Sequence, residues 1–186
     1  MPRAAPWYPW FKAAVFGLLV ANTAAYAAIG TASEALDSVA WLTLLAAFEL
    51  ETGLGGRFAE GRLAAALRGV RFVAAAAIFV AGIGYVLDRE WLDVANIALW
   101  IAVVVLLESG VRYPALAAAQ RKRFTAAAAT LYSGLAILVL VWLWQGDRFD
   151  AYDAALWLVA FATIEINVLG IARNAANRQG AGRSAA

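Results

Sequence analysis

Residues 96–108 read NIALWIAVVVLLE: a polar residue, a Trp four positions later and a Glu eight positions after the Trp, within an otherwise apolar run. The same pattern occurs twice more, as DSVAWLTLLAAFE at residues 37–49 and as DAALWLVAFATIE at residues 153–165. Because the chain holds only seven Glu, three of them in this register indicate a threefold internal repeat, with offsets of 59 and 57 residues.

The composition is that of an integral membrane protein. Hydrophobic residues make up 64% of the 186 residues, against roughly 45–50% in soluble domains. Each apolar block has a length close to the roughly 17–25 residues that a helix needs to cross a bilayer. The six blocks lie at about 13–30, 38–52, 70–87, 94–110, 124–144 and 154–172.

Each repeat unit contains two of these blocks. The offsets predict units at about 1–56, 57–114 and 115–174, followed by a tail at 175–186. We therefore expect one all-α transmembrane domain, in which six transmembrane helices form three pseudo-symmetric helical hairpins. All the expected turns are short, so the sequence predicts no separate soluble domain.

The charges divide between the two ends of the predicted helices. If the six blocks alternate in direction, 13 of the 15 Lys and Arg fall on one side, and only Arg89 and Arg148 fall on the other. By the positive-inside rule, this division predicts a plasma (inner) membrane protein with both termini in the cytoplasm. The opposite turns are acidic.

The first 28 residues also have features of a secretory signal peptide. They combine a basic start, an apolar stretch and a small-residue sequence at residues 25–27. Cleavage there would leave five apolar blocks and would break the first repeat unit. The alternation of charge over six blocks therefore favours retention of this segment.

The first two positions of the repeated pattern suggest structural roles. A short polar side chain before an apolar helix is typical of an N-cap, which we expect at Asp37, Asn96 and Asp153. An indole one turn further along is typical of a membrane-interface anchor or a packing residue, which we expect at Trp41, Trp100 and Trp157.

The Glu that ends each pattern is the candidate for function. At 1.5 Å per residue it lies about 18 Å inside its helix, in the cytoplasmic half of a hydrocarbon core about 30 Å thick. A carboxylate facing lipid there would cost about 2–3 kcal/mol or more, so we expect each Glu to face the bundle interior. The predicted ion-binding or relay residues are Glu49, Glu108 and Glu165, with Glu51 and Asn167 as secondary polar residues.

Basic residues stand near these Glu in sequence or in predicted depth. Arg112 follows Glu108 by four residues, which is the pairing distance on one helix face. The candidate ion-pair partners are Lys12, Arg57, Arg71, Arg112, Arg123 and Arg173. Two interpretations stay open: ion pairs that lock the hairpins together, or a ring of three carboxylates that binds a cation or relays protons.

The absence of Cys and His limits the chemistry. Without thiolates and imidazoles, the sequence predicts no metal site and no cofactor, and it cannot supply a Ser-His-Asp or Cys-His apparatus. We therefore do not expect an enzyme.

Two functions fit these features. The first is a small cation or proton channel or transporter, with the three intramembrane Glu as its polar centre. The alternative is a non-transporting membrane subunit or scaffold, whose Glu–Arg pairs lock the hairpins and whose basic cytoplasmic face binds lipid or a partner protein. In either case we expect contact with the lipid bilayer, a homo-oligomer or membrane complex, and no nucleic acid.

Overall fold

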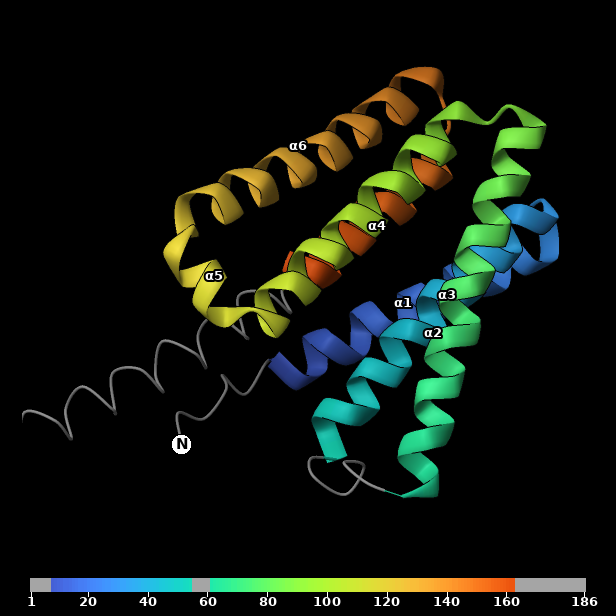
Figure 1. Ribbon diagram of the computed structural model, residues 1–186. Coiled ribbons are helices and arrows are strands. Elements are labelled where there is room, and N and C mark those ends of the chain that lie inside the picture. Colours follow the sequence, from blue (N-terminus) through green and yellow to red (C-terminus); the bar gives the residue numbers. More distant parts are fainter. Residues whose placement is uncertain (1–7, 55–60, 163–186) are drawn as a thin grey trace, which may run out of the picture.

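The computed structural model describes residues 8–54 and 61–162, and every regular element within them is helical (Figure 1). The all-α part of the prediction is confirmed. The helices are α1 (Tyr8–Ile29), α2 (Ala32–Leu54), α3 (Arg62–Asp88), α4 (Trp91–Arg112), the short α5 (Pro114–Ala119), α6 (Arg121–Gln145) and a last helix that is described over 148–162.

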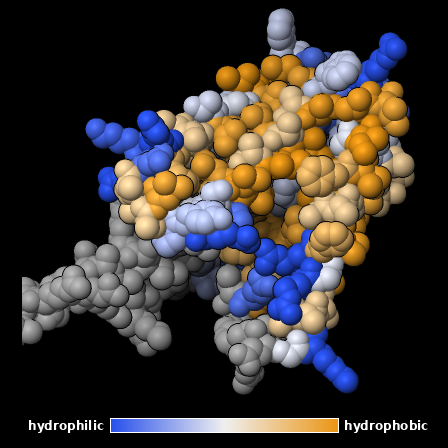
Figure 2. All heavy atoms as spheres, in the orientation of Figure 1, coloured by the Kyte–Doolittle hydropathy of each residue, from blue (hydrophilic) through white to orange (hydrophobic). Residues whose placement is uncertain are grey.

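Four of these helices are long and apolar enough to cross a membrane. They are α1, α3, residues Trp91–Gly110 of α4, and α6. Figure 2 shows hydrophobic side chains over most of the visible face and hydrophilic side chains at its margins. Large apolar side chains such as Phe72 and Trp144 are more than three-quarters exposed. A surface of this kind suits a lipid environment rather than water.

The helices run back and forth between two ends of opposite charge (Figure 1). One, which we call the acidic end, carries the turns between α1 and α2, between α3 and α4, and between α6 and the last helix. Acidic residues in and beside these turns are Glu34, Asp88, Glu90 and Asp147. The opposite or basic end carries α5 and the side chains of Lys12, Arg71, Arg112 and Arg121.

The helices at the acidic end begin earlier than the apolar blocks suggest, and the predicted N-caps at Asp37, Asn96 and Asp153 are wrong. In α2, the Glu34 amide donates to Thr31 Oγ1 over 3.2 Å, and the Thr31 amide donates to Glu34 Oε2 over 2.5 Å. This reciprocal capping box starts the helix at Ala32. The N-cap of α4 is Glu90. Acidic residues, such as Glu34 of α2 and Asp93 of α4, therefore stand in the first turns of these helices, where carboxylates interact favourably with the helix dipole.

Neighbouring helices pack in a fixed order. Within the hairpins α1 packs against α2 and α3 against α4, and between them α2 packs against α3 and α4 against α6. Gly84 allows α3 to approach α2 closely, because a Cβ there would collide with Ser33 Oγ. Gly134 has the same role on α6, where a Cβ would lie 3.2 Å from the Leu99 side chain of α4.

Candidate functional site

The three Trp of the repeated pattern meet in the core. Trp41, Trp100 and Trp157 are each at most 8% exposed. The ring centroid of Trp41 lies 6.3 Å from that of Trp100 and 6.5 Å from that of Trp157, and Phe161 packs against the latter two. These side chains therefore pack against one another inside the protein, and they are not anchors at the membrane surface.

On the side of these Trp that faces the acidic end lies a cavity of about 50 Å³, which we call the acidic cavity. Helices α1, α2, α3, α4, α6 and the last helix all contribute to its wall. The lining residues are Tyr26, Glu34, Asp37, Ser38, Trp41, Tyr85, Asp93, Asn96, Trp100, Trp142, Asp150, Asp153, Ala154, Trp157 and Phe161. Five of them are carboxylic acids, and none of these described lining residues is Lys or Arg.

Most of the lining residues stand at matching offsets from the three copies of the repeated pattern. Relative to the Asp or Asn of each pattern, every unit supplies an aromatic residue eleven positions earlier, an acid three positions earlier and a Trp four positions later. The four residues per unit are Tyr26, Glu34, Asp37 and Trp41 in the first, Tyr85, Asp93, Asn96 and Trp100 in the second, and Trp142, Asp150, Asp153 and Trp157 in the third. The last three positions are spaced three and four apart, so they share one helix face.

Sequence reasoning missed this site, although a signal for it exists. The acids at Glu34, Asp93 and Asp150 stand three positions before the Asp or Asn, so they lie outside a pattern that begins at the Asp or Asn and ends at the Glu. The aromatic position is harder to find. It lies on the preceding helix, and its residue type varies: it is Tyr26 and Tyr85 in the first two cases and Trp142 in the third.

Asp37 is the most unusual side chain of the cavity. Its Oδ1 atom is fully buried and has no hydrogen-bond partner among the described residues. Burial raises the pKa of this carboxyl group from 3.8 to about 7, with hydrogen bonds from Trp41 and Tyr85 acting in the opposite direction and the charges of Asp93 and Asp153 raising it further. Asp37 precedes the apolar block at 38–52, so it lies at the edge of the apolar layer.

Asp153 occupies the corresponding position in the third unit. It accepts a hydrogen bond of 2.8 Å from Asn22 Nδ2, and Asn22 is 5% exposed. Burial raises the pKa of Asp153 to about 6, although this hydrogen bond lowers it. Asp150, one turn earlier, accepts a hydrogen bond of 2.7 Å from the Tyr26 hydroxyl group. Burial raises the pKa of Asp150 as well.

Several partly buried carboxylates, with no Lys or Arg among the described residues that line the cavity, create a negative potential that attracts cations and protons. The volume exceeds the roughly 10–15 Å³ that a single water needs, which leaves room for a small cation. The acids do not form a compact metal site, because no group of three or more Asp, Glu, His or Cys within residues 8–54 and 61–162 has a metal-binding arrangement.

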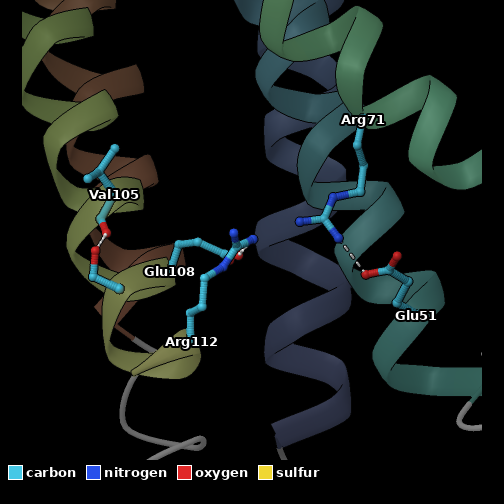
Figure 3. Close-up of polar contacts among 6 residues, drawn as sticks. Glu51, Arg71, Val105, Glu108 and Arg112 are labelled. Carbon is cyan, nitrogen blue, oxygen red and sulfur yellow. Dashed lines mark hydrogen bonds and ion pairs between the residues drawn. The ribbon is translucent and has the colours of Figure 1, made fainter. Parts of the chain in front are cut away.

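Glu49 and Glu108, the two residues of the predicted polar centre that the structure describes, do not line the acidic cavity. Glu49 forms an ion pair with Lys12 and lies against a second, smaller cavity of about 30 Å³ toward the basic end. Glu108 pairs with Arg112 over 2.9 Å on the same helix, α4, and its side chain is 54% exposed (Figure 3). Glu165 lies outside the described residues.

Arg71 and Arg123 are the remaining predicted ion-pair partners that the structure describes. Arg71 of α3 pairs with Glu51 of α2 over 2.8 Å, which links two helices (Figure 3). Arg123 donates a hydrogen bond to Gln120 Oε1 over 3.3 Å. Arg57, Asn167 and Arg173 lie outside the described residues.

The two cavities are stacked along the same helices. Trp41 lines the acidic cavity and Leu45, one turn further along α2, lines the smaller cavity. On the last helix, Trp157 and Ala160 are placed in the same way. A layer of buried aromatic and aliphatic side chains separates the cavities.

Comparison with family models, with curated proteins and with solved structures gives no match for this chain.

Proposed function

We propose that the protein is a membrane carrier for a small cation or a proton, with the acidic cavity as its outer binding site. The observation that carries this proposal is the set of residues that form the cavity wall. Three repeat units each place an aromatic residue, an acid, an Asp or Asn and a Trp around one small cavity, with no basic residue among these side chains. Buried ionisable groups without a basic partner are costly, and they commonly mark functional sites such as ion or proton pathways.

A closed ring of three hairpins is the arrangement that best accounts for these contacts. The first helix of the second unit packs against the second helix of the first, as α3 against α2, and α6 packs against α4 in the same sense. The ring closes where Asn22 and Tyr26 of α1 bond to Asp153 and Asp150 of the last helix.

Buried positions on the first helix of each unit support the same arrangement. Counted back from the Asp or Asn of the pattern, the residues at eighteen, fifteen and eleven positions are buried in all three units. They are Leu19, Asn22 and Tyr26 in α1, Ile78, Ala81 and Tyr85 in α3, and Leu135, Leu138 and Trp142 in α6. In this arrangement α2 and the last helix also span the membrane, which gives six spans.

The charge at the two ends sets the orientation in this proposal. The basic end faces the cytoplasm, so both termini are cytoplasmic in the inner membrane, and the acidic cavity faces the opposite side. Carboxylates around the entrance then concentrate cations there.

The layer of Trp between the two cavities favours a carrier over a permanently open channel. A cation that leaves the acidic cavity toward the cytoplasm meets Trp41, Trp100 and Trp157 before it can reach the Lys12–Glu49 pair. Passage therefore requires these side chains or their helices to move. Glu49, Glu108 and Glu165 then act on the cytoplasmic side of this layer, as relay or release residues.

Cation flux into liposomes tests this proposal. Purified protein should carry protons or a monovalent cation down an imposed gradient, and a double variant Asp37→Asn, Asp153→Asn should reduce the flux to that of empty liposomes. The matched control is Asp88→Asn with Asp147→Asn, which removes two exposed acids from the same end without touching the cavity. Equal flux from both double variants would contradict the proposal.

The alternative is a scaffold without transport. Its support is that Glu49, Glu51 and Glu108 each have a basic partner, and that the first two pairs join neighbouring helices. If wild-type protein in liposomes carries no proton and no cation under any gradient or voltage, the scaffold function is preferred. Isolation in mild detergent would then identify the proteins or the second copies of this chain that bind it.

A further inference from the structure

Two cavity atoms define what a ligand must provide. Asp37 Oδ1 and Asn96 Oδ1 are buried and have no hydrogen-bond donor among the described residues. The two residues occupy the same position of the repeated pattern and both line the acidic cavity. A carboxylate oxygen and an amide oxygen both accept hydrogen bonds, and leaving buried acceptors unpaired costs free energy. A ligand that supplies N–H donors would remove this cost.

The wall of the cavity also suits an organic cation. Trp41, Trp100 and Trp157 line it on the side away from the acidic end, and their rings give the wall aromatic, largely apolar surface. Tyr26 and Tyr85 add aromatic surface from α1 and α3. Apolar ring surface gives little to a hydrated metal ion, but it can contact the carbon atoms of an alkyl chain.

The arrangement of the acids is unfavourable for a divalent metal ion. A Ca²⁺ or Mg²⁺ site requires six or more oxygen ligands at short distances. In the part of the chain that the structure describes, the carboxylates stand apart around the cavity and do not gather into such a group. The separated carboxylates and the aromatic wall of the cavity therefore suit an organic cation better than a divalent metal ion.

We propose that the acidic cavity binds a small primary alkylammonium ion, whose N–H groups donate to Asp37 Oδ1 and Asn96 Oδ1 while its carbon atoms contact the Trp side chains. This inference rests on the proposed function, because it names the class of cation for that site.

Binding calorimetry on the whole protein in detergent tests the inference with three chloride salts. Methylammonium carries both charge and N–H donors, tetramethylammonium carries the charge without N–H donors, and K⁺ carries neither carbon nor N–H. We expect methylammonium to bind at least about tenfold more tightly than either of the others, since hydrogen bonds to a charged group are strong. If K⁺ or tetramethylammonium binds as tightly as methylammonium, the inference is wrong but the cation-binding function stands. If none of the three binds and liposomes also show no cation or proton flux, both are wrong.

Two variants test the donors directly. Asn96→Leu removes one acceptor at similar volume, and Asp37→Asn removes the charge, with Asp88→Asn as the control at an exposed acid outside the cavity. Asn96→Leu should weaken methylammonium about tenfold and leave tetramethylammonium nearly unchanged, which a general loss of structure would not do. Equal weakening of both ions would show that Asn96 does not select for N–H donors. The wild-type comparison decides the question even if a variant fails to fold.

Discussion

The Tyr26 hydroxyl group of α1 donates a hydrogen bond of 2.7 Å to Asp150 Oδ1 of the last helix, across 124 residues of sequence. The ring of Tyr26 also packs against Phe149, with centroids 4.9 Å apart. Together with the bond from Asn22 to Asp153, these contacts join the first helix to the last one beside the acidic cavity. The first and last helices of the described chain are thus held together beside the acidic cavity.

The seam between α1 and the last helix should contribute measurably to stability. Because the Asn22–Asp153 bond is partly buried and its acceptor is a carboxylate when ionised, Asn22→Ala should lower the free energy of unfolding by about 1.5–3 kcal/mol. The effects of Asn22→Ala and Asp153→Ala should not add, and a double-mutant cycle in detergent measures the coupling. Thr130→Ala is the control, since that hydroxyl group bonds to Ala126 O within its own helix. Additive effects would show that the two side chains do not interact.

Stability should fall as pH rises from about 4 to 7. Burial raises the pKa of Asp37 from 3.8 to about 7 and that of Asp153 to about 6, so the folded protein holds protons that the unfolded chain has already released. The contribution is fully present below pH 4 and is lost as pH passes through the raised values. The groups that face Asp37 are Glu34 of its own helix, Tyr85, Asp93 and Asp153, and none of them is basic.

Thermal unfolding in detergent at pH 5 and pH 8 measures this dependence. The wild-type protein should be more stable at pH 5, and Asp37→Asn should reduce the difference between the two pH values because it removes one of the responsible groups. A wild-type protein that is more stable at pH 8, or an unchanged difference in the variant, would rule out a buried proton on Asp37.

The sequence predicted the all-helical fold better than it predicted the site. Apolar blocks report burial or lipid contact along one helix, so the all-α class follows from them directly. The start of α2 depends instead on the local capping box of Thr31 and Glu34, which lies outside the apolar block. The break between α4 and α5 depends on Pro114, because the residue before a proline avoids the helical conformation.

The cavity depends on packing between helices, and no single segment of the sequence contains that information. Tyr85 lies eleven residues before Asn96 in sequence, but it faces Asp37 of the preceding unit in space. The Glu at the end of each pattern was the more conspicuous residue, because a carboxylate deep in an apolar run is rare. In the structure Glu49 and Glu108 are each satisfied by a nearby basic side chain.

The two Glu pairs at the basic end should differ in their effect on stability. Glu108 and Arg112 are both more than half exposed on one helix, so Glu108→Gln should cost only about 0.3–0.5 kcal/mol. Lys12 and Glu49 join α1 to α2, and Glu49 is 20% exposed, so Lys12→Met should cost more because it leaves a largely buried carboxylate without its cation. Chemical unfolding in detergent compares the two variants. A larger effect of Glu108→Gln would contradict this assignment.

The proposed orientation makes a prediction for each end. A Cys introduced at Gln145, which is exposed at the acidic end, should react with a membrane-impermeant maleimide added outside intact cells. A Cys at Ala119, which is exposed in α5 at the basic end, should react only after the membrane is opened. The native chain has no Cys, so each signal comes from one position. The reverse labelling pattern would invert the topology.

Carbodiimide labelling tests most directly whether a cation binds in the acidic cavity. A hydrophobic carbodiimide reacts with protonated carboxyl groups in apolar surroundings, and peptide mass spectrometry identifies the modified residues. Near pH 6 we expect modification of Asp37 and Asp153, and we expect methylammonium, or whichever cation the liposomes transport, to protect both. Modification of Glu49 or Glu108 alone, or labelling of Asp37 and Asp153 that no transported cation reduces, would contradict the acidic cavity as the binding site.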